Sequence, residues 1–172
     1  MRVPEIATKV TAYEPDAWHD FLIMTGGASA ALAGLLFVAV SLNLEQILKF
    51  TALPSLAAAS ISMLLAVVLA CCFGLVPGQP AVALGIELLV LGSSTASLLF
   101  VLVSRSLSRL EQLGWRVSRL LMTAVSTIPM VVAGVSLMAG DGGGLYWLLV
   151  GVVASVTTAT YNAWVLLIEI RR

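Results

Sequence analysis

Residues 53–76 read LPSLAAASISMLLAVVLACCFGLV, a stretch without a charged side chain. A helix that crosses the roughly 30 Å hydrocarbon core of a bilayer needs about 20 apolar residues, so this stretch is long enough to span a membrane. Its apolar residues run continuously, whereas a strand of a membrane barrel alternates apolar and polar residues over about 10 positions. We therefore predict a transmembrane helix here.

Similar apolar stretches lie on both sides of this one. The chain has 172 residues, of which 60% are hydrophobic and 10% charged, whereas soluble domains typically carry about 25% charged residues. Turn-forming residues separate some of the stretches, at 77–80 (PGQP) and 141–144 (DGGG). We predict an all-α helical bundle that forms a single membrane domain over residues 1–172. Its five transmembrane helices would span about 21–44, 53–76, 81–103, 117–139 and 145–168.

The basic residues predict how this bundle sits in the membrane. With five spans, the two ends of the chain lie on opposite sides. One side would carry Lys49, Arg105, Arg109, Arg116, Arg119, Arg171 and Arg172, and the other Arg2 and Lys9. Lys and Arg accumulate on the cytoplasmic side of membrane proteins. We therefore predict an outside N-terminus and a cytoplasmic C-terminus.

Two segments outside the spans carry clusters of ionisable residues. Residues 1–20 form an expected interfacial segment on the outer side, in which Asp16, His19 and Asp20 could form a pH-sensitive cap. A plain surface histidine is the simpler interpretation. A lone histidine without a second nitrogen or sulfur ligand does not predict a metal site.

The link at 104–116 is expected to be a basic cytoplasmic hairpin. Arg105 and Arg109 lie four residues apart, and Arg116 and Arg119 begin the next helix. Anionic lipid headgroups on the cytoplasmic side are the simplest partners for these arginines. Docking of another membrane protein is the alternative.

Glu87 is the acidic residue that lies well inside an apolar stretch. A charged carboxylate that faces lipid costs a few kcal/mol, so this side chain must be protonated, paired, or turned towards water or protein. We expect hydrogen bonds to neighbouring Ser or Thr side chains. Ser94 and Ser97 lie on or near the same helix face.

Ser155, Thr158 and Asn162 form a second polar stripe, in the last span. The two stripes allow two interpretations. They can supply hydrogen bonds between helices, worth about 0.6 kcal/mol per contact. Alternatively, they line a water-filled path with Glu87 as its outer cation or proton site.

Two further features concern helix packing. Gly26, Ala30 and Gly34 recur every four residues on one face, which is typical of a close helix contact, either inside the bundle or between subunits. Pro129 removes a helical hydrogen bond in the middle of its span and predicts a bend. That bend could be static or act as a hinge. We expect Thr123, Ser126 and Thr127 to bond the carbonyl groups that it frees.

The segments AWHDF (17–21) and GGASAALAGLLFVAVSLNL (26–44) resemble a family of small bacterial, largely actinobacterial, multi-pass membrane proteins. Some members carry the label "modulator of FtsH protease". The resemblance implies a location in the bacterial plasma (inner) membrane and favours a regulatory role. The family offers no catalytic motif to place on this chain.

The sequence contains neither a His-Glu-x-x-His motif nor a phosphate-binding glycine loop. We therefore predict a protein that is not an enzyme and that needs no cofactor, metal or nucleic acid. The leading interpretation is a self-associating accessory or regulatory subunit of a plasma-membrane complex. The alternative is a homo-oligomeric ion channel, or a transporter of protons or small solutes.

Overall fold

The computed structural model describes residues 12–50, 53–107 and 113–170. All regular structure in these ranges is helical, and five of the helices are long and apolar enough to cross a membrane. They are α2 (His19–Leu42), α4 (Leu53–Gly74), α5 (Ala81–Leu107), α6 (Leu113–Ala139) and α7 (Leu145–Ile170). A short 3-10 turn, η1 (Pro15–Trp18), precedes α2, and the short helix α3 (Leu44–Leu48) follows it. The predicted fold class is therefore confirmed.

The helix boundaries lie within two residues of the predicted spans, except where α5 ends and α6 begins. The first long helix ends at Leu42 rather than at residue 44. Asn43 leaves the helical conformation (φ −112°, ψ 16°), and its side-chain amide donates to the Ala39 carbonyl at 2.8 Å. In the region of the predicted 104–116 hairpin, α5 continues to Leu107 and α6 begins at Leu113. Residues 104–107 and 113–116, which were predicted to belong to the link, are therefore the end of α5 and the start of α6.

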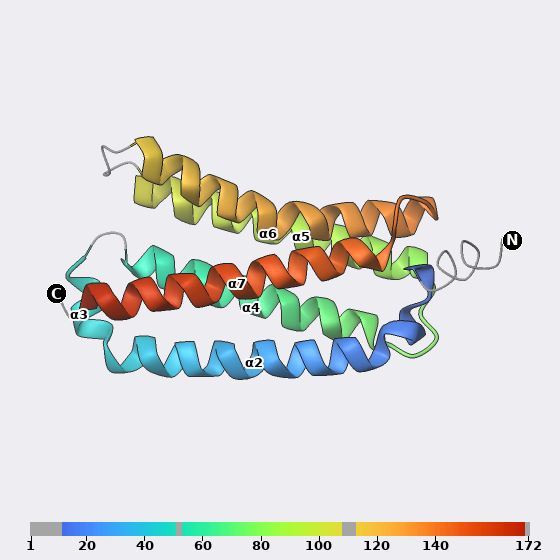
Figure 1. Ribbon diagram of the computed structural model, residues 1–172, viewed down its shortest axis with the longest axis horizontal. Helices are drawn as coiled ribbons and strands as arrows, with labels where there is room; N and C mark the ends of the chain where they lie inside the picture. Colours follow the sequence, from blue (N-terminus) through green and yellow to red (C-terminus); the bar gives the residue numbers. More distant parts are fainter. Residues whose placement is uncertain (1–11, 51–52, 108–112, 171–172) are drawn as a thin grey trace, which may run out of the picture.

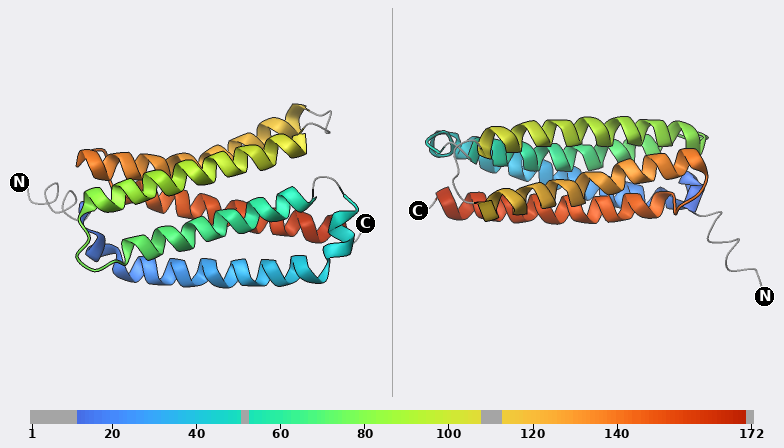
Figure 2. Two further views of the ribbon diagram at one scale, coloured as in Figure 1. Left: turned by 180° about the vertical axis from the view of Figure 1, so that it is seen from behind. Right: turned by 90° about the horizontal axis from the view of Figure 1, so that it is seen from above.

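Helices α4, α5, α6 and α7 form a four-membered bundle in which each packs against the next and α7 returns to α4. Figure 2 shows α4 and α5 in one layer with α6 and α7 in the other. Helix α2 lies outside this group and packs mainly against α4 (Figure 1). In the apolar 18-residue stretch of this span, 22% of the residues are buried, compared with 56% in the corresponding stretch of α4. Helix α2 is therefore the peripheral helix.

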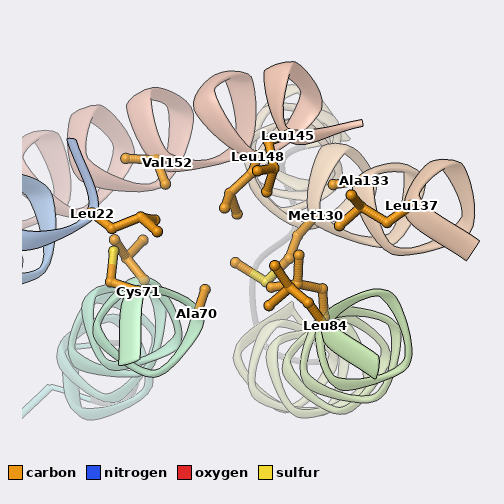
Figure 3. Packing of buried hydrophobic residues seen from close by; sticks show 12 residues of the cluster. Leu22, Ala70, Cys71, Leu84, Met130, Ala133, Leu137, Leu145, Leu148 and Val152 are labelled. Atoms are coloured by element: carbon orange, nitrogen blue, oxygen red, sulfur yellow. The ribbon is translucent and has the colours of Figure 1, made fainter. Parts of the chain in front are cut away.

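The buried core differs between the two ends of the bundle. Near the η1 end, one cluster draws residues from all five long helices (Figure 3), and Leu22, Cys71, Leu84, Met130 and Leu148 are among its members. At the opposite end a second cluster joins α2, α3, α4 and α7 without α5 or α6. The α5–α6 hairpin diverges from the other helices towards that end (Figure 1).

Helices α5 and α6 are in backbone contact at their glycines. A Cβ atom added at Gly134 would lie 2.7 Å from the Gly85 carbonyl oxygen, and one added at Gly85 would lie 2.8 Å from the Gly134 carbonyl oxygen. At Gly92 an added Cβ would meet a Val131 methyl group at 2.9 Å. Such backbone contact increases the van der Waals attraction that holds helices together in lipid. Among the described residues, the main contact between helices that glycines make is therefore the one between α5 and α6.

The turn between α6 and α7 is held by side chains from both helices and from the N-terminal segment. The Ser136 hydroxyl donates to the Asp141 carbonyl and accepts from the Gly144 N–H. Gly143 donates its N–H to the Tyr13 hydroxyl at 2.9 Å. The Trp18 ring packs edge-on against Tyr146, with ring centroids 5.0 Å apart. Residues 12–22 are therefore fixed to this end of the bundle.

Two buried serines permit a matched test of polar burial. Ser29 in α2 and Ser60 in α4 are both 0% exposed. The Ser60 hydroxyl donates to the Leu56 carbonyl at 2.9 Å, whereas the Ser29 hydroxyl has no hydrogen-bond partner among the described residues. Leaving a buried hydroxyl unpaired costs about 1–3 kcal/mol, more than a typical hydrogen bond contributes.

We expect Ser29→Ala to raise the free energy of unfolding by about 1 kcal/mol, because it removes the unpaired hydroxyl. Ser60→Ala, the matched control, should lower it by about 0.5–1.5 kcal/mol. Unfolding in mixed micelles with increasing denaturing detergent measures both. A larger loss of stability in Ser29→Ala than in Ser60→Ala would show that the Ser29 hydroxyl is paired after all.

Candidate functional site

Glu87 lies two turns into α5 and is half-buried. The Gln79 side-chain amide donates to its carboxylate at 2.7 Å. The expected Ser or Thr partner is therefore wrong, because a residue of the preceding PGQP link folds back along α5 instead. The sequence did contain a sign of this partner, because Gln79 is a long amide side chain just before the helix that carries this half-buried acid. The oxygen of the Gln79 side-chain amide (Oε1) is buried and has no hydrogen-bond partner in the described part of the chain.

The serines of α5 lie on the outer surface of the bundle. Ser94 and Ser97 are both exposed, and each hydroxyl donates within its own helix: Ser94 to the Leu91 carbonyl and Ser97 to the Ser93 carbonyl. Ser93 is also exposed and bonds to the Leu89 carbonyl, and it belongs to the same face. This stripe makes no hydrogen bond to another helix among those described.

The stripe on α7 faces the interior. Ser155 donates to the Ser126 carbonyl at 3.4 Å, and the Ser126 hydroxyl on α6 lies 3.4 Å from the Thr158 hydroxyl. Asn162 is buried one turn further along α7. These residues have the geometry expected for hydrogen bonds between helices. Within one chain the structure does not bring the α5 and α7 stripes together.

Pro129 is buried where α6 packs against α7. A Cβ atom added at Gly151 of α7 would lie 3.5 Å from the Pro129 Cβ atom, so the two helices meet closely there. Figure 1 shows that α6 changes direction near its middle. The hydroxyls of Ser126 and Thr127 donate to the Met122 and Thr123 carbonyls, not to the Val125 carbonyl that the proline leaves without its helical partner. The close packing favours a fixed bend.

The small residues of α2 separate into two groups. Gly26 faces α4, where an added Cβ would lie 3.0 Å from the Cys71 Cβ atom. Ala30 and Gly34 are exposed, and a Cβ added at Gly34 would have nothing within 4 Å. Gly27, which extends this face sideways, is equally open. Most of the predicted contact face is therefore unoccupied in one chain.

The remaining candidates lie at the two ends of the bundle. Asp16, His19 and Asp20 are all exposed near the start of α2. Arg109 lies outside the described residues, and the side chains of Arg105, Arg116 and Arg119 are outside the described side chains. The outer cap and the basic hairpin therefore stay predictions.

Comparison of the chain with protein-family models, curated proteins and solved structures finds no match. The resemblance of residues 17–44 to a bacterial family therefore stays a prediction. The five apolar helices suit a multi-pass membrane protein, and its activity must be inferred from the surfaces of those helices.

Proposed function

We propose that the protein is a non-enzymatic, self-associating membrane subunit with an accessory or regulatory role, and that its copies meet through α2. The observation that carries the proposal is the outward face of this helix. Its middle turns carry four small residues, Gly27, Ala30, Ala31 and Gly34, with larger exposed side chains such as Ile23 and Val38 beyond them. All four are exposed, and the two glycines have open space where a side chain would begin.

This face differs from the other glycine contacts of the bundle. Gly85, Gly92 and Gly134 each have a neighbouring helix within about 3 Å of an added Cβ. Lipid is as apolar as the helices, so their association depends on close packing and polar contacts, for which small residues are the usual means. Helix α2 has such a surface and packs mainly on α4. A second copy of α2 would supply the missing neighbour.

The proposal predicts a change in oligomeric state. Full-length protein extracted in mild detergent should behave as a dimer or larger oligomer, and native mass spectrometry measures this. The double variant Gly27→Leu/Gly34→Leu should dissociate at least tenfold more readily, a change of about 1.4 kcal/mol, because leucine side chains would separate the backbones.

The matched control is the exposed apolar face of α5, where Val82→Leu/Val90→Leu should leave the oligomer unchanged. A wild-type protein that is monomeric at every concentration would contradict self-association. The accessory role has its own readout, which is a second membrane protein recovered with the tagged chain in a fixed ratio. Recovery of the chain alone would contradict that role.

A homo-oligomeric channel is the second candidate, and the exposed hydroxyls of α5 favour it. Ser93, Ser94 and Ser97 lie on one side of a membrane-facing helix, with Glu87 towards the η1 end. Several copies around an axis could place these groups along a common path. Ion flux into liposomes that contain the purified protein, altered by Glu87→Gln, would support this function; liposomes without flux would contradict it.

A further inference from the structure

A cavity of about 240 Å³ opens between α2 and α7 at the end of the bundle that holds α3. Its walls include Leu32, Leu36 and Ala39 from α2 and Ala159 and Ala163 from α7. Both helices pack on α4. The small alanine side chains leave space between them, and the core cluster that α2 and α7 share at this end contains no residue of α5 or α6.

The cavity has the depth of one leaflet. Its lining on α2 runs from Leu32, near the middle of the helix, to Asn43 at its end. Eleven residues of helix at 1.5 Å each extend about 16 Å. Half of a bilayer's hydrocarbon core is about 15 Å. The cavity therefore runs from the expected membrane surface to the expected midplane.

The walls suit a hydrocarbon ligand. Apart from Asn43 and Thr160, the lining side chains are apolar. The Asn43 amide donates to the Ala39 carbonyl and the Thr160 hydroxyl donates to the Val156 carbonyl, each at 2.8 Å. Both polar groups thus bond within the backbone of their own helix. One extended alkyl chain is much narrower than a helix with side chains, which is about 10–12 Å across, and it suits an apolar cavity of this volume.

The segment at the surface end of the cavity carries a cation. Ile47 of α3 lines that end, and Lys49 follows it two residues later in the sequence, where its side chain does not line the cavity. The Lys49 ammonium donates to the Gln46 side-chain oxygen at 3.0 Å and is exposed. An ammonium group has three donors, so it can also bind a phosphate. Glu45 on α3 is exposed as well and would disfavour an anion placed beside it.

We propose that this groove binds one acyl chain of an anionic phospholipid from the leaflet at the α3 end, with Lys49 contacting the lipid phosphate. The groove then acts as a specific lipid site that fills the space between α2 and α7. It occupies a different side of α2 from the face of Gly27 and Gly34, so it does not depend on the proposed self-association.

Photo-crosslinking tests the proposal with full-length protein in nanodiscs. The probes are phosphatidylglycerol and phosphatidylcholine, each with a diazirine in the acyl chain, and mass spectrometry locates the labelled peptides. Label from phosphatidylglycerol should concentrate in residues 32–43 and 159–166. Ala39→Phe and Ala163→Phe fill the groove from opposite walls, and each should lower this label roughly fivefold, the equivalent of about 1 kcal/mol of binding free energy.

Ala28→Phe is the matched control, because it makes the same change on α2 at an exposed position outside the groove. Its label should equal that of the unmodified protein. Lys49→Gln should lower labelling by phosphatidylglycerol more than labelling by phosphatidylcholine, because the choline cation of phosphatidylcholine already offsets the charge of its phosphate. Even labelling along the exposed faces of all five helices, or label that survives both groove-filling variants, would overturn the acyl-chain site. Equal labelling by the two probes in the unmodified protein would overturn the preference for an anionic lipid.

Discussion

Gly134→Ala should lower the free energy of unfolding by about 3 kcal/mol, at the upper end of the usual cost of overpacking. The added methyl group would lie 2.7 Å from the Gly85 carbonyl oxygen and 2.8 Å from the Leu89 backbone nitrogen. Both neighbours are backbone atoms, which cannot move aside as the end of a flexible side chain can. The α5–α6 pair would have to separate along its length. Reversible unfolding in mixed micelles, followed by circular dichroism, measures the loss.

The matched control is Gly34→Ala, the same change on a membrane helix where an added Cβ has nothing within 4 Å. Alanine favours helix over glycine by about 0.8–1.0 kcal/mol, so in detergent solution dilute enough in protein to keep the chain monomeric this variant should be as stable as the unmodified protein or slightly more stable. The α5–α6 contact would be wrongly placed if Gly34→Ala and Gly134→Ala lost the same amount of stability.

Gly144→Ala should destabilise the turn between α6 and α7 by about 2–4 kcal/mol, because it combines backbone strain with a steric clash. Gly144 has a φ of +51°, and an added Cβ would collide with the Ala12 carbonyl oxygen. Relief of the clash requires residues 12–22 to move away from the turn. Faster amide hydrogen exchange in that segment, together with a lower unfolding midpoint, would report this movement.

Gly140 provides the comparison that separates strain from the clash. It has a φ of +67°, but an added Cβ there meets nothing within 4 Å. Gly140→Ala should therefore cost only the strain of a left-handed residue, about 1–2 kcal/mol. It should leave exchange in residues 12–22 unchanged. An equal effect of the two variants on that segment would contradict the docking of the N-terminal segment against the turn.

The long helices were predictable because their length and continuous apolar composition are local properties of the chain. The end of α2 was harder to place. Leu44 continues the apolar run, and the bend arises where the Asn43 side chain bonds to the Ala39 carbonyl. An asparagine inside an apolar stretch is compatible with either a helix interior or a helix end, so composition alone does not decide between them.

The packing could be predicted only in part, because it depends on which helices become neighbours. Gly26 and Gly34 are eight residues apart and belong to one run in the sequence, yet one contacts α4 and the other is open. Gly85 contacts Gly134, a residue of another helix that no spacing rule within one segment could identify. The sequence also does not show that Ser155 faces the interior. Its position depends on how α7 is turned about its own axis where it packs against Ser126 of α6.

Cysteine cross-linking in native membranes tests the central claim, that copies of the chain meet through α2. On a Cys72→Ser background, which removes the exposed native thiol, single cysteines are introduced as Gly34→Cys on α2 and Ser97→Cys on α5. Disulfides form when Cα atoms come within about 4.4–6.8 Å, so oxidation reports the helix at the contact. We predict a covalent dimer from Gly34→Cys and none from Ser97→Cys. A dimer from Ser97→Cys alone would contradict the account and place the hydroxyl-bearing face of α5 between the copies.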